Sequence, residues 1–290
     1  MVGARAPHRK YLTRNHREEL AVAQIPFQGR VALVTGAGRG FGRSIAQRLA
    51  HEGATVSVTA RTRRELDETA AQIEATGGTA IAVDGDSRSL ADVRRIVAET
   101  ERRLGTIDIL INNAGVAGPF GPFSETDPVA WWSAQEVHIR GPFNFIHAVL
   151  PGMIRLQRGH IVNVSARASH LIAPYLSAYC LGKNAQVKMA MLLAAEVRAD
   201  HVHAFSIDPG FVVTQLARDT MSAADARKWV PGMVQRLGER DAADTGKADL
   251  ARCAQRCVDL ACGRYDALSG NYYELTDDLD AAISRIQDQP

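Results

Sequence analysis

Short runs rich in β-branched and other apolar residues alternate with longer segments of mixed polarity from residue 31 onward. In the longer segments, apolar residues recur every three or four positions, which is the period of an amphipathic helix. This alternation predicts βαβ units and a parallel sheet covered by helices on both faces. Seven strands are expected: Val31–Thr35, Thr55–Thr59, Thr79–Val83, Ile107–Ile111, His160–Val164, Val202–Ile207 and Asn271–Leu275. The helical period is clearest at Ser44–His51, Arg63–Ala75 and Leu90–Leu104.

Two stretches depart from this alternation. Residues 1–28 precede the first strand without a clear period, and we interpret them as an N-terminal extension that wraps the domain or remains mobile. Residues 211–246 follow the sixth strand and place Met221, Trp229 and Met233 among charged residues. Insertions after the carboxyl end of a strand often cover a ligand. The expected organisation is therefore a single domain over residues 29–290, with a substrate-covering insertion at about 211–246.

Length and composition allow one large core, because 46% of the 290 residues are hydrophobic. The net charge of +2 does not favour nucleic acid or an anionic membrane as a partner, although the first seventeen residues are locally basic. We interpret that basic patch as a solvated tail. No apolar run approaches the roughly 20 residues of a membrane helix, and no signal peptide is evident, so a cytoplasmic location is expected.

The four cysteines point neither to a disulfide framework nor to a metal site. Cys253, Cys257 and Cys262 fall in one predicted helix, where they cannot form the paired framework of a secreted fold, and Cys180 stands apart. Buried reduced thiols are the preferred interpretation, and no metal is expected.

A glycine-rich turn, Thr35-Gly36-Ala37-Gly38-Arg39-Gly40-Phe41-Gly42, follows the first strand and opens the first helix. Glycines at this place let backbone N–H groups approach a pyrophosphate at the helix N-terminus. The turn therefore predicts a dinucleotide site, with Gly36, Arg39, Gly40, Phe41 and Gly42 among its residues.

The end of the second strand bears on the choice of dinucleotide. An acidic residue about 20 positions past the glycines would accept a hydrogen bond from a ribose 2′-hydroxyl, but this chain has Ala60-Arg61 there. Arg61 and Arg39 could make charge-assisted hydrogen bonds to a 2′-phosphate. NADP(H) is therefore favoured, with NAD(H) as the second possibility because either arginine could be an ordinary surface charge.

Tyr179 and Lys183 are four positions apart in a predicted helix, so both side chains project from one face. A tyrosine titrates near pH 10, and an adjacent ammonium group favours its phenolate form. This pair is suited to general acid/base chemistry.

Four motifs occur together and in order: the TGxxxGxG turn, Asn112-Asn113-Ala114-Gly115, Tyr179-Cys180-Leu181-Gly182-Lys183, and Pro209-Gly210-Phe211-Val212-Val213-Thr214. Over residues 29 to 275 the chain resembles the short-chain dehydrogenase/reductase family. The resemblance implies a Rossmann-type, doubly wound parallel sheet of about seven strands in a single α/β domain. It implies that Tyr179 is the general acid/base and that Lys183 also binds the nicotinamide ribose. It further implies the remaining cofactor contacts: Asn112, Ala114 and Gly115 on the adenosine side, Asp86 at the adenine, and Pro209, Gly210, Val212 and Thr214 at the nicotinamide end.

Two positions depart from the family's catalytic tetrad. The usual serine lies thirteen residues before the tyrosine, which is Ala166 here, and the usual asparagine position is His138. Ser165 lies one position too early and its side chain should face the other way, while Ser169 or His170 could reach the site through a rearranged loop. His138 either keeps a proton relay, which would be sensitive to pH near about 6 to 7, or packs within a helix Trp131–Leu150. Ala166 is either natural divergence or an introduced change.

The function expected from these observations is an NADP-dependent oxidoreductase, a ketoreductase that interconverts a ketone and a secondary alcohol. Ala166 and Trp229 should face the substrate, although Trp229 could equally be plain packing. The alternatives are an active-site-impaired reductase, or a repurposed site with cyclase, dehydratase or aldol-type chemistry. The expected partners are a small carbonyl or alcohol substrate and, by resemblance alone, further copies of the chain in a homotetramer or dimer through the helices Trp131–Gln157 and Ala178–Ala199.

Overall fold

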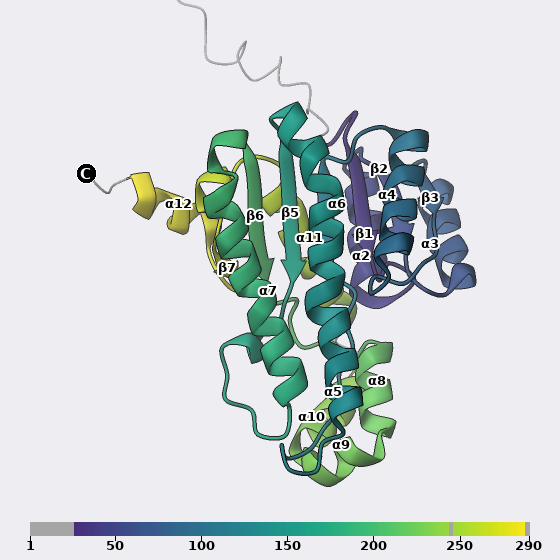
Figure 1. Cartoon of the computed structure of the whole chain (residues 1–290), viewed down its shortest axis with the longest axis vertical. Coiled ribbons are helices and arrows are strands. Elements are labelled where there is room, and N and C mark those ends of the chain that lie inside the picture. Colours follow the sequence, from purple (N-terminus) through teal and green to yellow (C-terminus); the bar gives the residue numbers. More distant parts are fainter. Residues whose placement is uncertain (1–25, 244–245, 288–290) are drawn as a thin grey trace, which may run out of the picture.

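The computed structural model describes residues 26–243 and 246–287. Its centre is one parallel sheet of seven strands in the order β3-β2-β1-β4-β5-β6-β7 (Figure 1). The strands are β1 Val31–Thr35, β2 Thr55–Thr59, β3 Thr79–Ala82, β4 Ile109–Asn112, β5 Gly159–Val164, β6 Val202–Ile207 and β7 Tyr272–Tyr273. The predicted Rossmann-type α/β fold is thus confirmed, and the strand boundaries differ by a few residues at most. β7 keeps only two residues, paired with Ser206 and Ile207 at the edge of the sheet.

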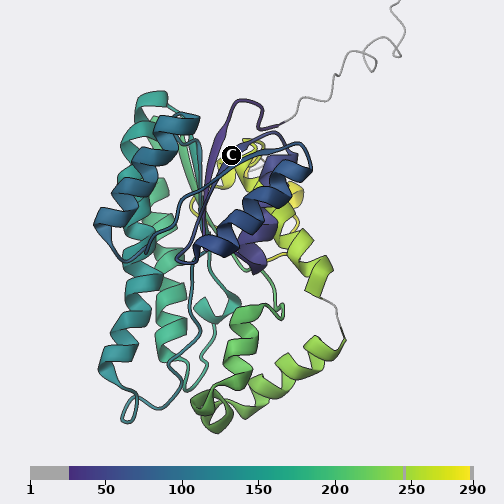
Figure 2. The ribbon, with the colours of Figure 1, turned by 90° about the vertical axis from the view of Figure 1, so that its right-hand side faces the viewer.

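The middle strands β1, β4 and β5 are buried on both faces because their side chains alternate between two helix layers. On β1, Ala32 and Val34 pack in the same core cluster as α2 (Gly40–His51), α3 (Arg63–Ala75) and α11 (Gly246–Ala261). Val31 and Leu33 pack in a second cluster with α4 (Leu90–Leu104), α6 (Gly141–Leu156) and α7 (Ser177–Glu196). Figure 2 shows the sheet between these two layers.

Local sequence signals explain where the helices begin and end. Ser89 caps α4 by accepting a hydrogen bond from the N–H of Asp92 at 3.2 Å. Asp127 caps α5 (Pro128–Gln135). Proline is well suited to the first position of this helix, because the N–H that it lacks would have no hydrogen-bond partner within the helix there. Gly53 follows α2 with a φ of 93°, a conformation that favours glycine after a helix.

The segment predicted as one helix over Trp131–Leu150 is interrupted. A single π turn, Glu136–Arg140, lies between α5 and α6, and the N–H of Gly141 bonds back five residues to the carbonyl of Glu136. Pro142 explains the break, because it has no N–H for the carbonyl of His138 four residues earlier and its ring would clash with that carbonyl. His138 therefore lies in irregular helix and not in a regular one.

The stretch 211–246 folds into three short helices, α8 (Gln215–Ser222), α9 (Ala224–Trp229) and α10 (Pro231–Ala242). They lie beyond the carboxyl ends of the strands, below the sheet in Figures 1 and 2. The chain after α11 adds β7 and α12 (Leu279–Gln287). None of the helices in the described ranges is long and apolar enough to cross a bilayer.

Most of the proposed N-terminal extension, including its basic patch, falls on residues 1–25 and so lies outside the described residues. Its last part does contact the domain. Phe27 is buried in the core cluster of α2 and α11, and its N–H donates to the carbonyl of Glu52 at 3.0 Å. Core contacts thus begin two residues before the boundary predicted at residue 29.

Candidate active site

A cleft of about 1300 Å³ is lined by residues at the carboxyl ends of the strands and by residues of α8–α10. The sheet order reverses between β1 and β4, and ligands of such sheets bind where the strand order reverses. Most of the sequence-predicted site residues line this cleft. They are Gly36, Arg39, Gly40, Phe41, Arg61, Asp86, Ala114, Gly115, Ser165, Ala166, Tyr179, Lys183, Pro209, Gly210, Val212, Thr214 and Trp229.

Side chains of Asn113 and Thr69 hold the glycine turn after β1 by donating hydrogen bonds to its carbonyl groups. Asn113 donates from its amide to the carbonyls of Thr35 at 2.9 Å and Gly36 at 3.2 Å, and Thr69 donates to that of Ala37 at 3.0 Å. The first N–H groups of a helix have no partner within the helix, and α2 begins at Gly40 with no acidic residue in its first turn. This end of the cleft therefore suits an anionic group such as a pyrophosphate.

Two residues predicted to contact the cofactor lie outside the cleft lining. The amide of Asn112 donates to Asn163 Oδ1 at 3.0 Å inside the sheet, whereas its neighbour Asn113 lines the cleft. Gly42 lies behind the turn, where a Cβ would be only 2.3 Å from the carbonyl oxygen of Gly36. Its role in this structure is to let α2 approach the turn.

The adenosine end of the cleft carries several charges. Arg61 follows β2 and lines the cleft, while Asp86 forms an ion pair with Arg88 at 2.6 Å. The Arg88 guanidinium holds the pKa of the Asp86 carboxyl below its usual range. Arg39 is shared between Glu65 at 3.5 Å and Asp219 of α8 at 3.8 Å. Glu65 of α3 also lines the cleft, so a carboxylate that was not predicted from the end of the second strand stands near Arg39.

Tyr179 and Lys183 meet at the cleft wall from successive turns of α7. The Lys183 ammonium lies 5.8 Å from the centre of the Tyr179 ring. Burial, and next the charge of Asp208, raise the pKa of Tyr179 above its ordinary value. Burial lowers the pKa of Lys183 to about 7. In the chain alone, burial thus keeps the tyrosine protonated at neutral pH.

No nearby serine replaces the hydroxyl missing at Ala166. Ser165 is buried, and its hydroxyl donates to the carbonyl of Lys183 at 2.8 Å, so it anchors α7. Ser169 donates to the carbonyl of Ala166 at 2.7 Å, and the His170 ring packs on Tyr272 at 4.4 Å. Neither Ser169 nor His170 is among the described residues that line the cleft.

His138 lies fully buried behind the cleft wall. Its Nε2 pairs with the carbonyl of Val116 at 2.9 Å, and its ring meets that of Tyr179 edge-on at 5.6 Å. Burial, and next the Lys183 charge, lower its pKa to about 3. The expected sensitivity of His138 near pH 6 to 7 is therefore wrong. A buried imidazole facing a carbonyl stays neutral, with the Nε2 hydrogen donated.

Known proteins resemble this chain over most of its length. A family model described as short chain dehydrogenase matches residues 30–225. The chain belongs to the short-chain dehydrogenase family. A short chain dehydrogenase of Pseudocercospora fijiensis is 33% identical over 91% of this chain and 85% of that protein. The 2-(S)-hydroxypropyl-CoM dehydrogenase 3 of Xanthobacter autotrophicus is 30% identical over 72% and 84%. The crystal structure of the KRED1-Pglu enzyme superposes with a TM-score of 0.74 at 27% identity, over 84% of this chain and 99% of that one.

Short-chain dehydrogenases are oxidoreductases that typically bind NAD(P)(H).

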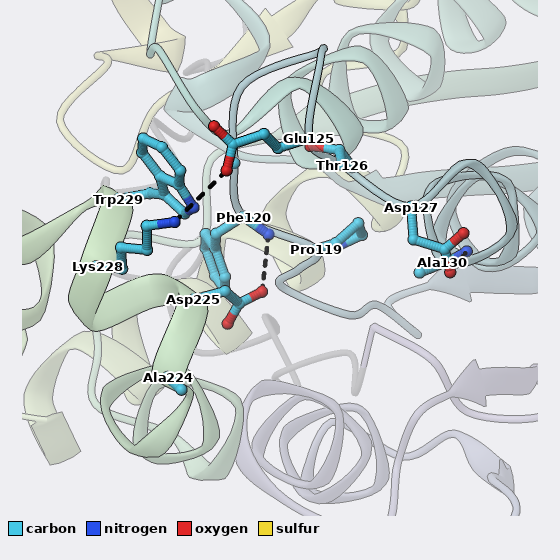
Figure 3. A pocket seen from close by; sticks show the side chains of 11 residues that line it. Pro119, Phe120, Glu125, Thr126, Asp127, Ala130, Ala224, Asp225, Lys228 and Trp229 are labelled. Carbon is cyan, nitrogen blue, oxygen red and sulfur yellow. Dashed lines mark hydrogen bonds and ion pairs between the residues drawn. The ribbon is translucent and has the colours of Figure 1, made fainter.

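The helices α8–α10 form one wall of the cleft in this chain. Asp225 accepts a hydrogen bond from the N–H of Phe120 at 3.1 Å, and Lys228 pairs with Glu125 at 3.5 Å (Figure 3). These contacts line a smaller pocket of about 530 Å³, which shares Phe120 and Trp229 with the cleft. They fasten α9 to the loop that follows β4.

Sequence reasoning missed Gln186, a fully buried polar residue that contacts the lysine. Its Oε1 accepts a hydrogen bond from Lys183 Nζ at 3.2 Å, and its Nε2 donates to the carbonyl of His138 at 3.0 Å. A signal was present in the sequence, because Tyr179, Lys183 and Gln186 share one helix face.

The depressed pKa of His138 gives a prediction for acid stability. The unfolded chain binds a proton on this imidazole as the pH falls through about 6.5, whereas the folded protein binds it only near pH 3. Between these values acid therefore favours unfolding. His138→Asn should lower the free energy of unfolding at pH 7 by removing the contact with Val116. Between pH 6.5 and 4, however, the free energy of unfolding should fall less in this variant than in the wild type. Denaturant titrations measure this, and parallel pH dependence in both proteins would contradict it.

Proposed function

We propose that this short-chain dehydrogenase is an NADP-dependent oxidoreductase that interconverts a ketone and a secondary alcohol. The observation that carries the proposal is that Tyr179 and Lys183 share one cleft with the glycine turn after β1. A helix N-terminus that suits an anion and an acid/base pair are what such a reaction requires of the protein.

The residues present fit a dinucleotide along the whole cleft. The pyrophosphate would lie at Gly36, Gly40 and Phe41, where the cradle has no room for side chains on the glycines: a Cβ at Gly36 would be 2.9 Å from the Cα of Ala114. Ala114, Gly115 and Asp86 would hold the adenosine side. The nicotinamide end would be held by Pro209, Gly210, Val212 and Thr214. Thr214 lies directly beside the glycine turn, because its side chain is 3.2 Å from the position that a Cβ on Gly40 would take.

The bound nicotinamide supplies or accepts the hydride. In the reductive direction, Tyr179 donates its phenolic proton to the carbonyl oxygen of the substrate. Tyr179 is protonated at neutral pH and so carries the proton that this direction needs, although the burial that raises its pKa also makes it a weaker acid. Lys183 lines the same wall, and its ammonium group would stabilise the phenolate that remains.

The substrate class is proposed from the side chains around Tyr179. Ala166 and Trp229 stand in a mostly apolar wall that also includes Ala117, Phe120, Leu171, Leu176, Val230 and Met233. Trp229 packs against Tyr175 at 5.2 Å between ring centres, with the two ring planes tilted by 36°. A bulky apolar ketone fits such a lining.

Ala166 favours two alternatives to an efficient reductase. It lines the cleft without a hydroxyl, and Ser165 is committed to the backbone of α7. Loss of one hydrogen-bond donor to a developing oxyanion typically costs a factor of about 10² to 10³ in rate. The chain would then be an impaired reductase, or would use Tyr179 in chemistry without hydride transfer.

The test is the rate of NADPH oxidation with a panel of apolar ketones. We expect slow turnover by the wild-type chain, a gain of about 10² or more in kcat for Ala166→Ser, and none for Ala166→Ser combined with Tyr179→Phe. If Ala166→Ser and the wild type both bind NADPH but reduce no ketone, the redox proposal is wrong and a repurposed site is favoured.

Preference for NADP is proposed from Arg61. It lines the cleft after β2, and among the described residues it has no carboxylate within 4.0 Å, unlike Arg39. Glu65 is the opposing feature, because its carboxylate could accept from a ribose hydroxyl and so favour NAD.

Arg61→Ala should weaken NADPH binding about tenfold or more and leave NADH binding nearly unchanged, because a charge-assisted hydrogen bond to phosphate is lost. Arg64→Ala is the matched control, since Arg64 is exposed in the first turn of α3 and pairs with Glu68. Fluorescence titrations measure both dissociation constants. Equal weakening of NADPH and NADH would contradict a 2′-phosphate contact.

A homo-oligomer is also proposed. The outer faces of α5, α6 and α7 expose large apolar side chains, among them Trp132 at 64% and Phe143 at 58% exposed, together with Val129, Leu181, Met191 and Leu192. Such a patch is unusual for a monomer, and a second copy of this chain would cover it. Sedimentation of the purified chain as a monomer at micromolar concentration would contradict this.

A further inference from the structure

Gln186 joins the lysine of the site to the π turn between α5 and α6. The residue is fully buried on the inner side of α7 and does not line the cleft. One end of its amide accepts from Lys183 Nζ at 3.2 Å, and the other donates to the carbonyl of His138 at 3.0 Å. Its own carbonyl accepts from Asn163 at 3.0 Å, which fixes the backbone of α7 at this residue.

The sequence explains why the carbonyl of His138 is available. In a regular helix it would accept from the N–H four residues later, but that residue is Pro142. His138 is buried, and a buried carbonyl without a partner is costly. Gln186 supplies the missing donor, so the contact between α7 and the π turn is specific.

The same contact settles where the hydrogens of Lys183 point. An ammonium group has three N–H donors. Two of them bond inside the protein, to the carbonyl of Val164 at 2.7 Å and to Gln186 Oε1 at 3.2 Å. Because Lys183 also lines the cleft, the third donor is left for a group bound there.

We propose that Gln186 is a positioning residue that keeps Lys183 charged and directs its remaining N–H into the cleft. This rests on the proposed function for the part played by Lys183. The two acceptors oppose the burial that lowers the pKa of Lys183 to about 7, since a hydrogen bond to the charged form favours that form. The titratable groups that face Lys183 are Tyr179 on α7 and His138 on the π turn, both uncharged near neutral pH, and Asp208 at the end of β6 faces Tyr179.

The test compares Gln186→Met with Gln186→Glu over pH 5.5 to 10. Methionine removes the acceptor, so Lys183 should lose its proton at a pH lower by about one to two units. Glutamate keeps an acceptor of the same size and adds a negative charge, so the proton should be lost at a higher pH. NADPH dissociation constants, measured by fluorescence at each pH, should therefore rise earlier in the methionine variant and later in the glutamate variant than in the wild type.

A second readout needs no cofactor. The unfolded chain holds the lysine proton up to about pH 10.5 but the folded protein only to about 7, so the stability of the wild type rises with pH across this interval. Denaturant titrations should place the start of this rise at a lower pH in Gln186→Met and at a higher pH in Gln186→Glu.

Gln135→Met is the matched control, because Gln135 is buried, lies on α5 and donates to the carbonyl of Ala178 at 2.9 Å without contacting Lys183. It should lower stability without moving either pH profile. The proposal is overturned if both Gln186 variants keep the wild-type profiles, or if Gln135→Met shifts them as Gln186→Met does. The two proposals can fail separately. If the chain binds no NADPH at any pH, but its unfolding profile still moves to lower pH in Gln186→Met and to higher pH in Gln186→Glu, the proposed function is wrong and the role of Gln186 in holding the lysine proton stands.

Discussion

The close approach of α2 to the turn after β1 is the constraint on which the site depends. Gly42 allows it, because a Cβ there would lie 2.3 Å from the Gly36 carbonyl oxygen. Asn113 and Thr69 hold the carbonyls of the turn on the protein side. The first N–H groups of α2 are thereby left for the cleft, where the strand order of the sheet reverses. The suitability of this end of the cleft for an anion therefore follows from backbone packing rather than from charged side chains.

The catalytic end is organised by polar groups that bind one another. Ser165 bonds to the backbone of Lys183, and Gln186 joins Lys183 to His138. Buried polar groups that are paired in this way fix a structure, because an unpaired one is costly. Of the groups at this end, the Tyr179 side chain and one N–H of Lys183 are left for the cleft, which both residues line. The departures from the family pattern at Ala166 and His138 therefore lie in different places: Ala166 lines the cleft, where the proposed function puts the substrate, whereas His138 is buried behind the cleft wall.

The sheet could be predicted because its strands are apolar runs bounded by turn residues, and Tyr179 and Lys183 because a four-residue spacing defines a helix face. The placement of Asn112 and Asn113 could not be predicted, since it depends on which way the chain turns after β4. Glu65 was missed because only the packing of α3 beside the turn brings it to the cleft. The π turn had a local signal in Pro142, yet its consequence, a buried carbonyl satisfied from α7, exists only in the folded chain.

The dependence of the site on the close approach of α2 can be measured by equilibrium binding of NADPH to the wild-type chain, Gly42→Ala and Gly238→Ala. Gly238 lies in α10 with nothing within 4 Å of its Cβ position, so it controls for adding a methyl group. We expect stoichiometric binding by the wild type and Gly238→Ala with the same dissociation constant. Gly42→Ala should bind at least tenfold more weakly, because the turn must shift to admit the side chain. Unchanged NADPH affinity in a folded Gly42→Ala protein would show that the site does not depend on this packing.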